Sequence, residues 1–248
     1  MYQFFVAPGQ IRLDTKTVWI EGSDVNHIKN VLRMKPGEEI AVSNGEDGKE
    51  YRCAIRNITD TEVECELRFV KEDGVELPSR ILLFQGLPKA DKMELIIQKA
   101  VELGAAGIVP VATKRCVVKL DDKKARSKVA RWQGIAEAAA KQSKRGVIPR
   151  VEDVMSFKDA LKMASEMDVK LIPYELAEDM THTRGIFEQI RPGQSVAIFI
   201  GPEGGFDEAE IEQALAAGAE PVTLGKRILR TETAGFTVLS WLVYLLEQ

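Results

Sequence analysis

Hydrophobic and polar residues follow two different periods along the chain, and the change of period divides it in two. Up to about residue 70, β-branched and aromatic residues gather in short runs that alternate in part and are separated by turn residues. This pattern predicts strands at residues 2–6, 17–21, 39–43, 51–58 and 62–70. A series of such short strands is typical of a small β-barrel or sandwich.

One helical segment interrupts these strands, at residues 24–34. Val25, Ile28 and Val31 recur at helical spacing and predict its apolar side. Lys29 and Arg33 lie on another side of the same helix. An exposed basic helix face on a barrel would suit a nucleic-acid backbone.

A polar stretch at residues 71–79, which contains glycine and proline, is the best candidate for a linker. Beyond it, short apolar runs alternate with amphipathic helical patterns. We expect strands at residues 80–86, 108–113, 169–174, 195–200 and 221–224. We expect helices at residues 89–104, 121–145, 156–166, 208–217 and 234–246, and a short helical or irregular piece at 181–190. The alternation predicts an α/β domain whose parallel sheet carries helices on both faces. The chain should therefore have two domains, residues 1–72 and 73–248.

Two glycine-bearing loops each follow a predicted strand and precede a predicted helix. The first is GPEGGF at residues 201–206, and the second is LGKRILRTETA at residues 224–234. Both should emerge at the carboxyl edge of one sheet, where ligands bind in open α/β proteins. Asp207 and Glu210 form an acidic variant of the capping box between them.

The glycines of these loops let main chain approach a ligand closely. Neither loop has the spacing of a phosphate-binding loop, and the chain has no dinucleotide fingerprint, zinc-protease motif or serine-hydrolase elbow. This combination indicates a pocket lined by main chain that takes an adenosine ligand without a polyphosphate. Leu224, Ile228 and Leu229 would be its apolar walls.

Arg230 and Glu232 stand among hydroxyl residues between the second loop and the last helix. A guanidinium can stabilise negative charge on a reacting group. The carboxylate would orient that guanidinium or accept a proton. The alternative interpretation is a capped helix start with a salt bridge.

Charge is distributed unevenly in a chain whose composition is otherwise that of an ordinary globular protein, with 45% hydrophobic and 29% charged residues. The net charge is −4, yet residues 114–150 hold twelve basic side chains against three acidic ones. This excess predicts a surface that faces a polyanion, with a solvated helix face as the alternative.

Signals for a membrane, a secretory pathway or a metal are missing from the sequence. No apolar run has the length of a membrane span, and the first residues do not resemble a signal peptide. The three cysteines are widely spaced and fit neither a disulfide framework nor a zinc site. We expect reduced thiols, a cytoplasmic protein, and neither a metal nor a membrane partner.

Four stretches give the chain a family resemblance: the two loops, KADKMELIIQKAVELG at residues 89–104 and EAAAKQSKR at residues 137–145. Together they resemble the 16S ribosomal RNA uracil-N3 methyltransferases of the SPOUT superfamily, and the likeness covers nearly the whole chain. It implies a C-terminal SPOUT domain tied in a trefoil knot and an N-terminal PUA-like barrel that binds RNA. It also implies a homodimer that uses S-adenosylmethionine to methylate N3 of a uridine in 16S ribosomal RNA, within the small ribosomal subunit.

The resemblance also assigns residues. Arg230 and Glu232 would be catalytic. Cofactor contacts would be Gly201, Glu203, Gly205, Leu224, Gly225, Ile228, Leu229, Arg230 and Thr231, with Tyr174 and Glu175 at an adjacent strand end. RNA contacts would be Lys29, Arg33, Lys89, Arg115 and Arg145.

Three other functions remain open at this point. The chain would be an RNA-binding assembly factor if its pocket were vestigial. A nucleotide-dependent enzyme such as a dehydrogenase is disfavoured by the missing phosphate fingerprint. Methylation of a different base or RNA is compatible with the same fold.

Overall fold

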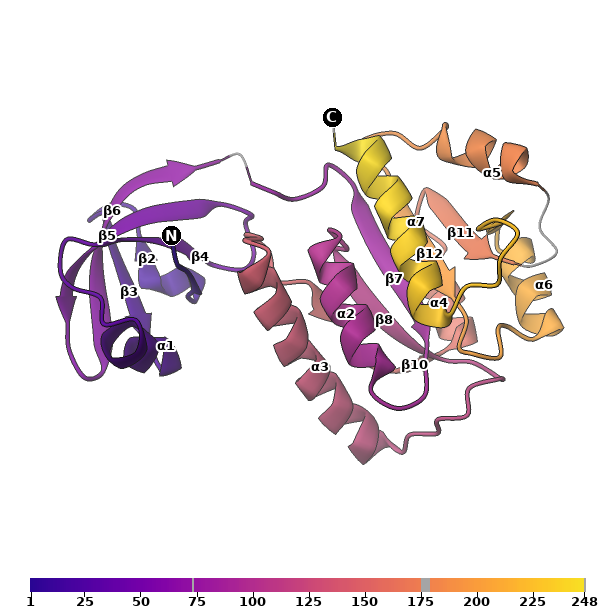
Figure 1. Cartoon of the computed structure of the whole chain (residues 1–248), viewed down its shortest axis with the longest axis horizontal. Helices are drawn as coiled ribbons and strands as arrows, with labels where there is room; N and C mark the ends of the chain where they lie inside the picture. Colours follow the sequence, from indigo (N-terminus) through magenta and orange to yellow (C-terminus); the bar gives the residue numbers. More distant parts are fainter. Residues whose placement is uncertain (73, 175–178, 248) are drawn as a thin grey trace. The chain divides into compact units, whose positions relative to one another are not determined.

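The computed structural model describes residues 1–72, 74–174 and 179–247, which are organised in two compact units (Figure 1). The first unit comprises residues 1–76 and 140–148, and the second comprises residues 77–139 and 149–248. Residues 140–148 thus belong to the first unit although they lie far along the chain. No helix among the described residues combines the length and the apolar character needed to cross a membrane.

The first unit is built on a curled, barrel-like sheet of six strands in the order β1-β4-β5-β6-β3-β2. At one edge of the sheet, β1 and β4 are parallel, and all other neighbouring strands are antiparallel. The strands are β1 (Gln3–Phe5), β2 (Ile11–Arg12), β3 (Thr17–Glu21), β4 (Glu39–Ser43), β5 (Glu50–Ile58) and β6 (Glu62–Lys71), with a 3-10 turn η1 (Pro8–Gln10) before β2. The five predicted strands are confirmed, whereas β2 is too short to show a periodic pattern.

The helix expected at residues 24–34 is shorter and of a different kind. α1 (Ser23–Asn26) passes directly into a π turn, η2 (His27–Val31), in which the amide of Leu32 donates to the carbonyl of His27 at 2.8 Å. A π turn contains one residue more than an α turn and so rotates the residues that follow it. Val25 and Ile28 are buried as predicted, whereas Val31, at the end of the π turn, is rotated away from them and is 61% exposed.

Polar contacts hold residues 140–148, the second stretch of the chain that belongs to the first unit. The side-chain amide of Gln3 donates to the carbonyl of Arg145 at 2.9 Å, and the Lys141 ammonium lies 3.0 Å from a carboxylate oxygen of Asp24. Val147 forms a parallel bridge with Gly45. These contacts tie residues 140–148 to β1, α1 and the β4–β5 connection, which are far away in sequence.

The second unit contains a seven-stranded sheet in which every pair is parallel, with the order β10-β8-β7-β12-β11-β13 and β9 on β8. The strands are β7 (Arg80–Gly86), β8 (Gly107–Ala112), β9 (Arg150–Val151), β10 (Met155–Ser156), β11 (Val169–Pro173), β12 (Ser195–Ile200) and β13 (Glu220–Val222). The helices are α2 (Lys92–Glu102), α3 (Asp122–Gln142, whose end lies in the first unit), α4 (Phe157–Ala164), α5 (Met180–Phe187), α6 (Glu208–Ala216) and α7 (Thr231–Leu246).

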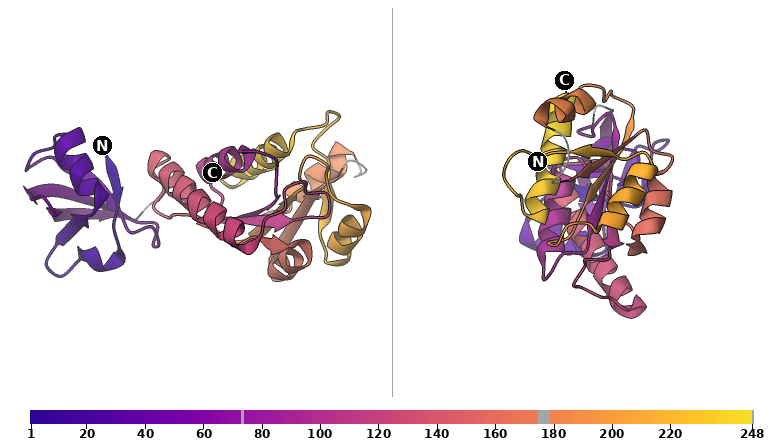
Figure 2. Two further views of the ribbon diagram at one scale, coloured as in Figure 1. Left: turned by 90° about the horizontal axis from the view of Figure 1, so that it is seen from below. Right: turned by 90° about the vertical axis from the view of Figure 1, so that its right-hand side faces the viewer.

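Helices cover both faces of this sheet, as predicted (Figure 2, right). On one face, Phe157 of α4 and Ile211 of α6 pack in a cluster with Phe84 and Phe199 from the central strands β7 and β12. On the other face α2 and α7 lie side by side (Figure 1). Gly235 of α7 faces the sheet, where a Cβ would be in ordinary van der Waals contact with Ile200 and Leu83. Burial on both sides explains the continuous apolar runs at residues 81–84 of β7 and 196–200 of β12.

Helix ends follow the capping signals in part. Ser156 caps α4, and Asp207 with Glu210 forms the expected capping box of α6. The last helix starts earlier than predicted, since Arg230 is already the N-cap of α7. α3 ends at Gln142 and not near residue 145.

Candidate functional site

A cavity of about 950 Å³ opens at the carboxyl edge of the parallel sheet. The loops after β11, β12 and β13 form most of its wall, together with the starts of α2, α5 and α7. The prediction that both glycine-bearing loops meet at one sheet edge is therefore confirmed. A cavity of this size is large enough for a nucleoside-sized ligand.

The first loop, residues 201–206, depends on glycines for its compact turn. A Cβ on Gly201 would lie only 3.0 Å from the Cα of Gly205, and Gly205 has a positive φ of 65°. On the neighbouring strand end, a Cβ on Gly86 would lie 2.7 Å from the main-chain nitrogen of Pro202. The loop is thus pressed against itself and against β7, so its main chain forms the wall of the cavity.

Two basic residues after β8 fix the far side of this loop. Arg115 donates to the carbonyl of Gly204 at 3.1 Å and lines the cavity. The Lys114 ammonium lies 2.9 Å from Asp207, and its hydrogen bond lowers the pKa of that carboxyl. The main-chain amide of Lys114 also donates to Glu210 at 2.8 Å. The capping box of α6 thereby holds the loop after β8 as well as its own helix.

The second loop, residues 224–230, presents some main-chain groups that no described residue pairs with. Its amide at Gly225, where φ is 100°, donates to the hydroxyl of Thr223 at 3.3 Å. For the amides of Ile228 and Leu229, the described part of the chain provides no hydrogen-bond partner. The side chain of Ile228 is 95% exposed. Such a loop offers donors, acceptors and an apolar side chain to a ligand.

A buried hydrogen-bond network joins the two loops. The hydroxyl of Thr231 donates to the carbonyl of Gly201 at 2.6 Å, and it accepts from the side-chain amide of Gln85 at 2.8 Å. The same amide of Gln85 also donates to the carbonyl of Gly86 at 3.0 Å. Gln85, in the central strand β7, and Thr231, in the first turn of α7, are both buried. The start of α7 is therefore fixed relative to the end of β12.

Arg230 and Glu232 have different surroundings although they are two residues apart. Arg230 is exposed and lines the cavity, and no described acidic side chain forms an ion pair with it. Glu232 is 15% exposed and is not among the described residues that line the cavity; the Lys92 ammonium lies 3.8 Å from its Oε2. The expectation that Glu232 orients Arg230 has no support from any contact between them, because the carboxylate faces Lys92.

Glu203 is held by the start of α2. Its Oε1 accepts from the Lys92 ammonium at 2.8 Å and from the main-chain amide of Lys89 at 3.1 Å. Partial burial raises the pKa of Glu203, but the hydrogen bonds from Lys92 and Lys89 outweigh it and leave the pKa below its usual value. Glu203 is consequently an anion that ties the first loop to α2.

The structure brings all predicted cofactor contacts of its described part together in this one cavity. The lining includes Tyr174, Gly201, Glu203, Gly205, Leu224, Gly225, Ile228, Leu229, Arg230 and Thr231. Glu175 lies outside the described residues. Sequence reasoning missed Lys92 and Gln85, because the importance of each depends on a partner far away in the chain. Their binding roles stay predictions.

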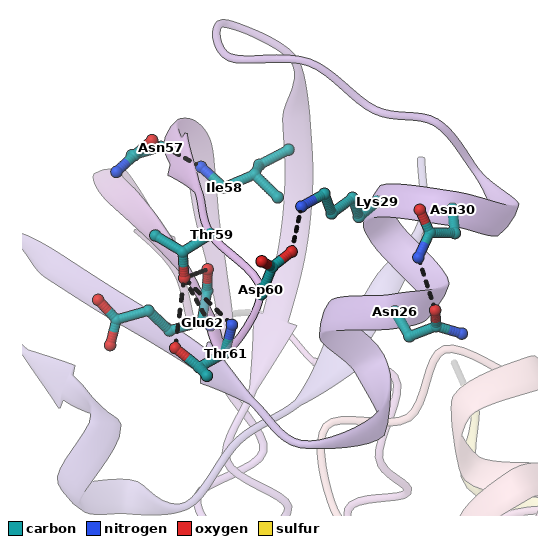
Figure 3. A network of polar contacts seen from close by, with 9 residues as sticks. All are labelled: Asn26, Lys29, Asn30, Asn57, Ile58, Thr59, Asp60, Thr61 and Glu62. Atoms are coloured by element: carbon teal, nitrogen blue, oxygen red, sulfur yellow. Dashed lines mark hydrogen bonds and ion pairs between the residues drawn. The ribbon is translucent and has the colours of Figure 1, made fainter.

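The residues predicted to contact RNA are spread over both units. In the first unit, Lys29 of η2 donates to Asp60 in the β5–β6 turn at 2.5 Å, and this bond lowers the pKa of Asp60 (Figure 3). Arg33, just after η2, is exposed and has a φ of 55°. In the second unit, Lys89 is exposed and Arg115 lines the cavity.

For Arg145 the structure gives a different role. Its guanidinium is buried, with 4% of the side chain exposed, and it donates to Glu76 at 2.5 Å. Its burial and its ion pair give the predicted RNA contact of Arg145 no support from the structure, and they indicate a structural role for this side chain.

The basic excess of residues 114–150 is smaller in the fold than in the sequence. Acidic side chains from other segments neutralise part of it, in the pairs Lys114–Asp207, Arg131–Glu94, Lys141–Asp24 and Arg145–Glu76. Exposed basic residues that form no ion pair with a described residue include Lys123 and Arg126 on α3. The predicted surface for a polyanion is thus reduced to a part of the run.

The described residues also contain no group of three or more histidine, cysteine, aspartate or glutamate side chains that could hold a metal ion. The cavity is lined by main-chain groups, by the guanidinium groups of Arg115, Arg227 and Arg230, and by the ammonium groups of Lys92 and Lys226.

Comparison with known proteins shows that two protein families match this chain. The RNA methyltransferase domain family matches residues 75–243, and the RNA methyltransferase PUA domain matches residues 20–68. The ribosomal RNA small subunit methyltransferase E of Bacillus subtilis (strain 168) is 39% identical over 251 residues, which cover 100% of this chain and 98% of that protein.

Two solved structures are similar over nearly their whole length. A ribosomal RNA small subunit methyltransferase E from Neisseria gonorrhoeae, bound to S-adenosyl methionine, has a TM-score of 0.81 at 35% identity and covers 97% of this chain and 96% of its own. A methyltransferase from Legionella pneumophila in complex with the same cofactor has a TM-score of 0.81 at 33% identity, with the same shares covered.

Proposed function

Because the chain belongs to the RNA methyltransferase family that includes the ribosomal RNA small subunit methyltransferases E, we propose that it methylates N3 of a uridine in 16S ribosomal RNA with S-adenosylmethionine. The observation that carries this proposal is the composition of the cavity. On one wall the amides of Ile228 and Leu229 in the second loop have no partner among the described residues, and beside them lies the guanidinium of Arg230, with which no described acidic side chain forms an ion pair. The first suits an adenosine group without a polyphosphate, and the second suits a substrate that becomes negatively charged.

The residues that would hold the cofactor are those of the two loops. Main-chain amides and carbonyls of residues 224–229 would bind the adenine edge, and Leu224, Ile228 and Leu229 would pack on its faces. When bound, the cofactor supplies a methyl group whose bond to the sulfonium breaks, with the electron pair left on sulfur, as the N3 lone pair of the uracil forms the new bond.

N3 of uracil carries a proton at neutral pH and is a poor nucleophile until that proton leaves. Its loss to water places negative charge on the two carbonyl oxygens that flank N3. Arg230 would stabilise this charge from the cavity wall. Water is the better proton acceptor than Glu232, because that carboxylate faces Lys92 outside the cavity lining.

The target base has to be unpaired or extruded, since N3 takes part in Watson–Crick pairing. We propose that the RNA is recognised within the small ribosomal subunit and that Lys29, Arg33, Lys89 and Arg115 contact it. By family resemblance we further propose a homodimer, a trefoil-knotted second unit and a cytoplasmic location, where ribosomal RNA is assembled.

The test is incubation of the protein with labelled S-adenosylmethionine and unmodified small subunits, followed by mapping of the modified base. We expect one uridine methylated at N3. Arg230→Ala should lower the single-turnover rate at least about tenfold. The matched control is Arg80→Ala, which removes an exposed arginine at the opposite end of β7.

Two results would contradict the proposal. Label found on another base or on another RNA would show that a uridine of 16S ribosomal RNA is not the substrate. Failure of S-adenosylmethionine to bind at about millimolar concentration in calorimetry would favour an RNA-binding assembly factor with a vestigial pocket.

A further inference from the structure

Lys92, the first residue of α2, is placed at the cavity by two acidic residues from other elements. Its ammonium lies 2.8 Å from Glu203 in the loop after β12 and 3.8 Å from Glu232 in the first turn of α7. The three side chains are 29%, 28% and 15% exposed, respectively. An ammonium between two carboxylates is held in one place, although lysine side chains are usually flexible.

The hydrogen-bonding capacity of this ammonium is only partly used. It has three N–H donors. Glu203 accepts one of them, while the 3.8 Å separation from Glu232 is too long for a hydrogen bond. Glu203 itself is shared with the amide of Lys89. Lys92 therefore has a donor left for a ligand in the cavity that it lines.

Arg230 and Lys92 line the same cavity from different elements, the N-cap of α7 and the first turn of α2. A uracil that loses its N3 proton has two negatively charged oxygens, one on each side of N3. One cation for each oxygen would make the proton easier to remove, and each cation acts most strongly where water is excluded.

We propose that Lys92 donates a hydrogen bond to a carbonyl oxygen of the target uracil and stabilises the N3-deprotonated base. This inference rests on the proposed function and adds a second cation to it. A contact of Lys92 with O4 would also account for base selectivity, because cytosine shares the O2 carbonyl but carries an amino group, a donor, where uracil has its O4 acceptor. A cationic donor at that position accepts uracil and repels cytosine.

The experiment compares Lys92→Met with Lys99→Met in single-turnover methylation at saturating cofactor and subunit, between about pH 6.5 and pH 9.5. Lys99 is the matched control because it is a lysine two turns further along α2 that is also paired with a glutamate, Glu102, at 2.7 Å. We expect Lys92→Met to be at least about tenfold slower at neutral pH and Lys99→Met to match the wild type.

The pH profile separates a role in charge stabilisation from a merely structural one. If Lys92 stabilises the deprotonated base, the deficit of Lys92→Met shrinks as rising pH removes the N3 proton without help. It shrinks as well on RNA with 5-fluorouridine at the target, whose N3 proton is more acidic. A deficit that is the same at every pH and on both substrates would overturn the inference.

Two further measurements keep the result decisive if Lys92→Met is poorly folded. Calorimetry with S-adenosylhomocysteine should give an affinity within about threefold of the wild type. Lys92→Arg should keep most of the neutral-pH rate, because the charge is kept; a loss as large as that of Lys92→Met would contradict the proposal. A wild-type protein that methylates no uridine would overturn the proposed function, and this inference with it.

Discussion

The hydroxyl of Thr231 donates to the main-chain carbonyl of Gly201 at 2.6 Å, and this bond connects the two loops that form the cavity. The residues are thirty positions apart in sequence, at the end of β12 and the start of α7. Since Thr231 also accepts from buried Gln85, its hydroxyl is used as donor and as acceptor at once. One small side chain thus connects both loops to the central strand β7.

Thr231→Val keeps the shape of that side chain and removes the hydroxyl. We expect the free energy of unfolding of the second unit to fall by about 1–3 kcal/mol, because the carbonyl of Gly201 loses its donor and the buried amide of Gln85 loses one of its two acceptors. Affinity for S-adenosylmethionine should fall as well, since the loops are no longer held together. Urea unfolding and calorimetry measure the two effects. Thr233→Val, at an exposed position of the same helix turn, is the control and should change neither.

Glu203 predicts a dependence of stability on pH. Its pKa in the folded protein is lowered, so its contribution is complete above the usual glutamate value of about 4.3 and is lost as pH falls through the folded pKa. The thermal midpoint of the wild type should exceed that of Glu203→Gln at neutral pH, and the gap should narrow in acid. A gap that widens as pH falls would mean that the ion pair with Lys92 is not what stabilises the loop.

Arg145→Ala should destabilise the first unit by about 3 kcal/mol, because it leaves the carboxylate of Glu76 without its buried partner. Lys144→Ala removes an exposed charge one residue earlier and serves as the control. Chemical unfolding followed by circular dichroism compares them. Equal stability of the two variants would show that the buried pair adds nothing.

Substitutions of the two members of the Lys29–Asp60 ion pair should change RNA affinity in opposite directions (Figure 3). If Lys29 contacts a phosphate, Asp60→Asn should strengthen binding a few-fold by releasing it, whereas Lys29→Ala should weaken binding and lower the salt slope by about one. Fluorescence anisotropy with 16S ribosomal RNA at several salt concentrations tests both. Variants that shift affinity in the same direction would argue against a phosphate contact.

Much of the fold follows from local pattern. β3, β4, β7 and β12 have the bounds that the sequence predicts, because each is an apolar run closed by turn or charged residues. The capping signals of α4 and α6 are likewise local. The π turn of η2 is not, since the helical spacing of Val25, Ile28 and Val31 gives no indication of an extra residue.

The sequence predicts the parts of the site that main chain forms. It does not predict contacts between side chains that are far apart in the sequence. Glycines mark both loops in the sequence, so the cavity wall was found. The partners of Lys92 and Arg145, by contrast, lie more than sixty residues away in the chain, and no local sequence pattern indicates them. A count of basic residues overestimates the positively charged surface for the same reason, because it omits acidic side chains from other parts of the chain.

Residues 140–148 pack with the first unit, so the polypeptide crosses between the units three times. A protease that cuts near residues 74–79 would therefore nick the molecule without releasing a free barrel. A fragment that ends at residue 72 would lack the strand bridge at Gly45 and the segment that fills this side of the barrel. The first unit is thus not a detachable module, and its integrity depends on synthesis of the chain well into the second unit.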